Sequence, residues 1–129
     1  MPIEYEYDQK LNLLHVHPFG NISNMDIAIY FKDIAVDDRI SNGFIELVHF
    51  MRVEKFIFSS DEVGNFAMAF NEVREKKGVS STVFIGTSDM HYGIGRMFQA
   101  FIDFYCPGHD VHVVRDEEEA LKAIKERND

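Results

Sequence analysis

The chain has 129 residues, of which 46% are hydrophobic, and a formal net charge of −9. This length and composition fit one domain, residues 1–129, with a single core. The charge has the wrong sign for neutralising phosphates, and no window approaches the ~20 apolar residues of a membrane span. We therefore expect neither nucleic-acid binding nor membrane insertion.

Cysteine content and the start of the chain indicate a compartment. Cys106 is the only cysteine, so an internal disulfide is excluded and the usual zinc-finger spacings are absent. Residues 1–8 are acidic and lack the basic start and apolar stretch of a signal peptide. These features predict a soluble, cytoplasmic protein.

The first elements are two strands and a helix. Residues 3–8 alternate between apolar and acidic side chains, and residues 11–17 follow a short turn, so the two runs predict an antiparallel hairpin. Pro18 and Gly20 should end the second strand. Ser23 lies three residues before an aspartate, a variant of the capping box, and predicts the start of a helix.

The middle of the chain predicts a strand and then the clearest helix. Residues 44–50 form a mostly apolar strand, and a short apolar run follows at residues 56–58. Ser59 and Glu62 match a full capping box, and apolar residues then recur at helical spacing up to Gly78, a C-terminal glycine.

The last third of the chain predicts strand, helix, strand and helix. The apolar runs at residues 83–85 and 111–114 flank an amphipathic segment that includes Met97 and Phe101. An acidic helix start follows at residues 116–119. Two strands joined through a helix are most simply parallel neighbours with a right-handed crossover. The predicted fold class is therefore α/β, an open sheet of about five mostly parallel strands with an N-terminal hairpin and four helices.

The turn before the third helix is the candidate ligand or partner site. Ligands tend to bind at the carboxyl ends of parallel strands, and polar side chains gather there within a few residues. The site consists of Asp89, His91, Tyr92, Gly93 and Arg96. The alternative is structural, because Gly93 and Gly95 also permit close helix packing or a dimer contact.

Histidines and the cysteine give no complete metal or catalytic set in the sequence. His15 and His17 share one face of a strand, while His49 and His112 lie on other predicted strands. Two ligands do not make a site, so no metal and no cofactor are expected. Cys106 lies in a turn without an orienting group, and no nucleophile and base can be assembled, so we expect no enzyme.

The third helix carries more apolar side chains than one sheet contact needs. Phe101, Phe104 and Tyr105 widen its apolar surface. This surplus indicates a protein partner, and a symmetric homodimer is the commonest arrangement for a small protein.

The order of elements resembles the STAS superfamily of anti-sigma-factor antagonist domains. Residues 88–100 contain an aspartate, glycines and an arginine before a methionine-aromatic pair; a valine strand follows at 111–114, then Glu119 and Ala120 at a helix start. This pattern resembles the bacterial SpoIIAA-like family of STAS/SEC14-type proteins. The resemblance implies a STAS-like α/β domain, mostly without demonstrated activity, and the SEC14 connection suggests a lipid-like ligand.

The resemblance also implies a candidate phosphorylation switch. Members with the switch carry an aspartate, two serines and a glycine at the start of the second helix. Ser59 and Ser60 match the serines, whereas Phe58 replaces the aspartate and Asp61 the glycine. The structural interpretation of Ser59 is a helix N-cap.

We therefore expect a small non-catalytic regulatory or protein-interaction module that self-associates. It would present the starts of its second and third helices to a protein partner. The alternative is a protein that binds a small or lipid-like molecule near the third helix.

Overall fold

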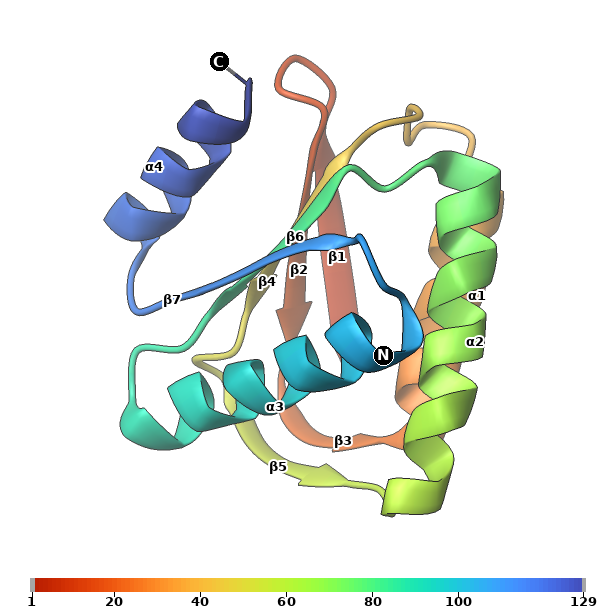
Figure 1. The fold of residues 1–129 in the computed structure, drawn as a ribbon, viewed down its shortest axis with the longest axis vertical. Coiled ribbons are helices and arrows are strands. Elements are labelled where there is room, and N and C mark those ends of the chain that lie inside the picture. The colour runs from red at the N-terminus through yellow and green to blue at the C-terminus, as the bar shows by residue number, and fades with distance from the viewer. Residues whose placement is uncertain (1, 129) are drawn as a thin grey trace.

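The computed structural model describes residues 2–128 and shows one main sheet crossed by helices (Figure 1). The order of its strands is β1-β2-β4-β6-β7; β1 runs antiparallel to β2, and all the other neighbours are parallel. The strands are β1 (Ile3–Asp8), β2 (Leu13–Pro18), β4 (Ile45–His49), β6 (Ser81–Ile85) and β7 (Asp110–Val114). This confirms the predicted hairpin and the mostly parallel sheet.

The helices divide between the two faces of the sheet. They are α1 (Asn24–Val36), α2 (Ser60–Lys77), α3 (Asp89–Tyr105) and α4 (Glu117–Asn128). Helices α1, α2 and α3 pack on one face, and α4 packs alone on the other, as Figure 1 shows. The two faces follow from the alternation along the strands, since Leu14 and Val16 point to the first face and Leu13 to the second.

A second, two-stranded sheet was not predicted. Strand β3 (Gly20–Ser23) pairs in parallel with β5 (Val53–Ile57), and Ile22 lies opposite Phe56. From the sequence we expected no strand between the end of β2 at Pro18 and the first helix. That expectation is wrong, because β3 lies there. Gly20, at a φ of 70°, redirects the chain, and the four residues that follow are too few to show a strand period.

Helix starts agree with the sequence at α1 and differ at α2. Ser23 Oγ accepts the N–H of Asp26 (3.3 Å), and the Asp26 carboxylate accepts the N–H of Ser23 (2.9 Å), which confirms the capping box. Ser59 is the N-cap of α2, but its side chain makes no capping hydrogen bond. The Glu62 N–H donates instead to the backbone carbonyl of Ser59 (3.1 Å), so the capping box predicted there is wrong.

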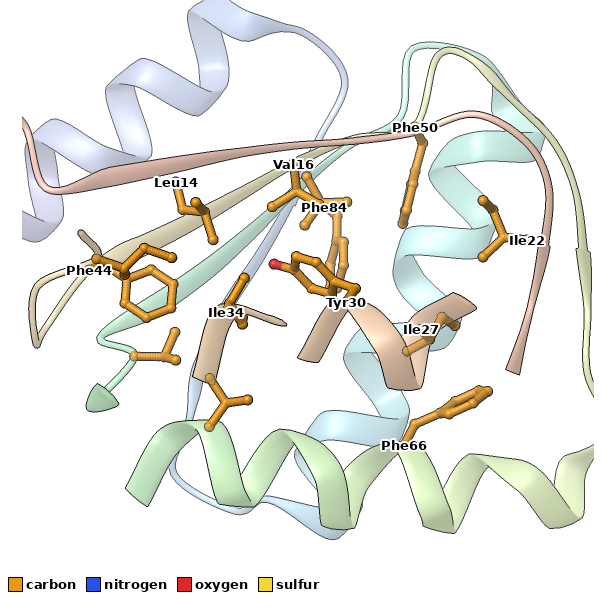
Figure 2. Close-up of a cluster of buried hydrophobic side chains, with 14 of the residues drawn as sticks. Leu14, Val16, Ile22, Ile27, Tyr30, Ile34, Phe44, Phe50, Phe66 and Phe84 are labelled. Carbon is orange, nitrogen blue, oxygen red and sulfur yellow. The ribbon is translucent and has the colours of Figure 1, made fainter. Parts of the chain in front are cut away.

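The main core lies between the sheet and helices α1 to α3 (Figure 2). Aromatic rings fill much of it, and Phe50 stacks on Phe84 with ring centroids 5.3 Å apart. Figure 2 shows Phe66 of α2 pointing toward this layer from the helix below it. The predicted unit of β6, α3 and β7 is present, with Val83 of β6 opposite His112 of the parallel strand β7.

Candidate functional site

The predicted site begins where β6 ends and α3 starts, and His91 is its best-fixed member. His91 is 8% exposed; its Nε2 lies 2.7 Å from the carbonyl oxygen of Val53, and its Nδ1 lies 2.9 Å from Ser88 Oγ. A carbonyl only accepts, so Nε2 carries the proton and Nδ1 accepts from the Ser88 hydroxyl. Both ring nitrogens are therefore engaged within the protein, and His91 fastens the start of α3 to β5.

Gly86 explains why α3 can start so close to the strand. A Cβ at this position would lie 2.5 Å from the backbone of His91 and Tyr92. Only glycine permits that approach without moving the helix.

Asp89 and Tyr92 meet an arginine that the sequence analysis left out. Arg115, between β7 and α4, has its Nη1 2.7 Å from Asp89 Oδ1, and its guanidinium carbon lies 4.2 Å from the centre of the Tyr92 ring. Arg115 is distant in sequence from Asp89 and Tyr92. The predicted parallel pairing of β6 with β7 could have revealed the contact, because it places the turns that follow these two strands side by side. The arrangement is exposed, so it contributes little to stability and leaves the charges accessible to a partner.

Arg96 and the two glycines of α3 take different environments. Arg96 and Gly93 are exposed, whereas Gly95 is buried, and a Cβ on it would lie 2.8 Å from Val113 Cγ1. Gly95 therefore serves helix packing, as the structural alternative held. The five predicted residues share the first two turns of α3, but none of them lines the cavity of the core.

The serines proposed as a phosphorylation switch lie at the start of α2. Ser59 is exposed and Ser60 is the first residue of the helix. Asp61 and Glu62 follow in the same first turn and would repel a phosphate. Phosphorylation at Ser59 or Ser60 stays a prediction.

A partly open cavity of about 100 Å³ lies between the sheet and the helices that cover its first face. Its walls come from the sheet and from α1, α2 and α3, and include the rings of Phe50, Phe70, Phe98 and Phe101. Packed protein interiors have few voids larger than a water molecule, and this one is several times larger than a water needs. From the sequence we expected a small or lipid-like ligand near the third helix, and the cavity borders α3 through Phe98, Phe101 and Ile102.

Behind the cavity wall, Tyr30 and Glu46 belong to a hydrogen-bonded network that sequence reasoning missed. Tyr30 Oη donates to one carboxyl oxygen of Glu46, and Thr82 Oγ1 donates to the other (2.9 Å). Thr82 has one proton, so His109 Nε2, 2.9 Å from the same hydroxyl, is the donor in that contact. The available signal was a charged residue inside an otherwise apolar strand.

Burial changes the acidity of these groups. Glu46 is 4% exposed, and burial raises the pKa of its carboxyl although the bonds from Tyr30 and Thr82 oppose the shift. Burial, together with the neighbouring Glu46, also raises the pKa of Tyr30 well above its ordinary value. Among the residues that line the cavity, Glu46 is the one with an ionisable carboxyl group.

Two further groups complete the comparison with the sequence analysis. Cys106 is 1% exposed, and burial raises the pKa of its thiol, which fits a structural thiol rather than a nucleophile. His15 and His17 share a face as predicted, and His49, which the sequence placed on another strand, lies beside them.

Comparison with known proteins places the fold. The chain matches no protein-family model and no curated protein. Among solved structures, it is similar to the unphosphorylated form of the anti-sigma factor antagonist SpoIIAA, with a TM-score of 0.57, 12% identity, and coverage of 95% of this chain and 97% of that chain. The phosphorylated form of SpoIIAA from Bacillus matches with a TM-score of 0.52 and 12% identity, over 95% of this chain and 98% of that chain.

A third structure is similar over the same length. It is an uncharacterised protein of the DUF3478 family from Shewanella loihica PV-4, described as having a SpoIIAA-like fold. The TM-score is 0.56 and the identity 14%, over 95% of this chain and 91% of that chain. The architecture therefore belongs to the α/β class with helices on both faces of a mostly parallel sheet. Within that class, the chain has a SpoIIAA-like STAS fold.

No helix within residues 2–128 combines the length and the apolar composition that crossing a membrane requires.

Proposed function

We propose that this protein is a small, non-catalytic STAS-like module that binds an apolar molecule in the cavity between its sheet and helices α1 to α3. The observation that supports the proposal is the cavity of about 100 Å³ with its wall of aromatic and aliphatic side chains. Cavities of this chemistry exclude water and accept apolar molecules. The ligand-binding alternative thus becomes the preferred function.

The Glu46 carboxyl restricts the kind of molecule. Its oxygens accept hydrogen bonds, and a second anion beside it in a buried site would be costly. The wall of the cavity is almost wholly apolar, and both Glu46 oxygens already accept hydrogen bonds, so an uncharged apolar molecule fits it better than one with a carboxylate.

Structural roles of the candidate catalytic groups support a function without catalysis. The thiol of Cys106 is buried, and both ring nitrogens of His91 are occupied by Ser88 and Val53. Thr82, whose hydroxyl contacts both a carboxyl and a histidine, is fully buried and lies outside the cavity wall. A nucleophile must reach its substrate, and neither Cys106 nor Thr82 is placed to do so.

The binding of benzene, a small uncharged molecule, measured by isothermal titration calorimetry, tests the proposal. Ala67 lines the cavity, so Ala67→Leu fills part of it and should weaken binding at least tenfold. Ala100 is exposed on α3, and Ala100→Leu is the matched control that should leave binding unchanged. Absence of binding to the wild-type protein, or equal binding by the Ala67→Leu variant, would overturn the proposal.

Exposed apolar side chains support a second candidate, self-association. Phe104 is 77% exposed, Tyr105 42% and Met68 70%. Tyr105 reaches α2, because a Cβ on Gly64 would lie 3.9 Å from its hydroxyl oxygen. The end of α3 and the middle of α2 thus form an exposed apolar surface, and we propose a second copy of the chain as its partner.

A further inference from the structure

Three histidines meet on the α4 side of the sheet. His15 and His17 belong to β2, and His49 ends the neighbouring strand β4. The register that pairs Val16 with Val48 brings His49 beside His17. Each histidine offers one ring nitrogen, and these three atoms all lie within 4.8 Å of one another.

The distances suit a single metal ion. His15 Nδ1 lies 3.3 Å from His49 Nε2, and the rings of His17 and His49 stack with centroids 4.6 Å apart. Nitrogens that bind one tetrahedral zinc ion at ~2.0–2.1 Å lie about 3.3 Å from each other. One pair therefore already has the required separation, and rotation of the partly exposed His17 side chain brings in the third nitrogen.

Two carboxylates flank the cluster from other elements. Glu117 Oε1, in the first turn of α4, lies 3.7 Å from His49 Nδ1, the ring nitrogen that faces away from His15. A carboxylate that accepts a hydrogen bond from the second ring nitrogen orients a metal-binding imidazole, and a small rotation of the exposed Glu117 side chain brings its oxygen within that distance. Glu6 Oε1 of β1 lies 3.4 Å from His17 Nε2 and supplies an oxygen at the open side of the cluster.

Burial divides the cluster into a fixed part and an accessible part. His49 is 5% exposed and is held between the strands and α4, whereas His15 and His17 are partly exposed. An ion can reach the cluster from solvent and is then shielded on the side of His49. The negative charge of the whole chain also favours a cation.

We propose that His15, His17 and His49 bind one Zn²⁺ ion, with Glu6 or water as the fourth ligand and Glu117 orienting His49. Neutral imidazole nitrogens select zinc and its neighbours among the transition metals, whereas Mg²⁺ and Ca²⁺ prefer oxygen ligands. The tetrahedral separation of His15 from His49 favours Zn²⁺ over ions that require a square plane.

Equilibrium dialysis against zinc chloride, with the metal counted by mass spectrometry, tests the proposal on the full chain freed of any affinity tag. The wild-type protein should retain one Zn²⁺ per chain, and the Co²⁺ form should show the visible absorption of a tetrahedral site. His17→Gln removes a ligand at a partly exposed position and should weaken binding more than tenfold. Glu117→Gln should weaken it by about 10-fold to 100-fold.

His112→Gln is the matched control. His112 also lies on a strand beside a carboxylate, with its Nε2 3.1 Å from Asp110 Oδ2, but it is outside the cluster. Its replacement should leave zinc binding unchanged. His15→Asn provides a second ligand variant, and circular dichroism establishes that each variant is folded. The proposal is overturned if the wild-type protein binds no stoichiometric zinc, if both ligand variants bind like the wild type, or if His112→Gln weakens binding as much as they do.

Discussion

At the scale of single residues, the carboxyl group of Glu46 combines a structural and a chemical role. Hydroxyl groups from α1 and β6 hold its two oxygens, and the side chain borders the cavity. Among the described residues, every fully buried side-chain nitrogen or oxygen has a hydrogen-bond partner. Removing the hydroxyl of Tyr30 or Thr82 would leave a Glu46 oxygen buried without a hydrogen-bond partner, which costs about 1–3 kcal/mol.

Glu46 should make the free energy of unfolding depend on pH. Its ordinary pKa is 4.5, and burial raises the pKa in the folded protein. As the pH rises above 4.5, the unfolded carboxyl loses its proton before the folded one does, so stability falls until the pH passes the folded pKa. Below 4.5 this group gives no pH dependence.

Glu46→Gln should remove this effect, because an amide does not titrate. Between pH 4.5 and the raised pKa of the folded protein, the difference in unfolding free energy between wild type and variant should change by up to about 1.4 kcal/mol per pH unit. Urea unfolding at a series of pH values above 4.5 measures the difference. Glu54→Gln, at an exposed position of β5, is the control, and a pH-independent difference for Glu46→Gln would contradict the prediction.

At the scale of elements, α3 approaches the sheet through its glycines. Gly95 faces Phe84 and Val113, so the helix backbone lies close to β6 and β7, whereas Gly93 on the same helix has no neighbour within 4 Å. Glycine lowers helix stability by a similar amount at both positions. The two positions differ in what a Cβ would contact. This makes them a matched pair for separating propensity from contact.

Gly93→Ala should stabilise the protein, whereas Gly95→Ala should leave stability unchanged or lower it. Alanine in a helix is favoured over glycine by about 1 kcal/mol, and Gly93→Ala should show that gain. A Cβ on Gly95 would lie 2.8 Å from Val113 Cγ1, and such overpacking costs about 1–3 kcal/mol, which offsets or exceeds the gain. Thermal unfolding of both variants measures the difference, and equal stabilisation by both would show that α3 has room to move.

At the scale of the whole molecule, one apolar surface stays exposed to solvent among the described residues. It is formed by Met68, Phe104 and Tyr105 of α2 and α3. Replacing its most exposed member, Phe104, by serine should shift the protein from dimer toward monomer, at least tenfold in dissociation constant. Sedimentation equilibrium measures the shift.

Leu121→Ser is the control for this experiment. Leu121 is 57% exposed on α4, on the opposite side of the sheet. Its replacement should leave the association unchanged. A wild-type protein that stays monomeric at every concentration, or equal effects of the two substitutions, would exclude this surface as the dimer contact.

The sequence by itself determined most of the helices and strands and the relative direction of some neighbouring strands. Alternation in residues 3–8 and helical spacing around Met97 and Phe101 are local patterns, and short connections between helices and strands favour parallel neighbours. The hairpin and the parallel pair β6 and β7 followed from these patterns. The SpoIIAA-like fold was implied by the resemblance of the last third of the chain to that family. Strand β3 was missed because four residues carry no detectable period.

Only the tertiary structure decided which distant side chains meet. His49 comes beside His15 and His17 because β4 pairs with β2, and Tyr30, Glu46 and Thr82 join because α1 lies over β4 and β6. Local spacing carries no information about strand order, which is fixed by how the whole core packs. The cavity and the histidine cluster therefore exist only in the folded chain, whereas the strands and helices that form them could be predicted from the sequence.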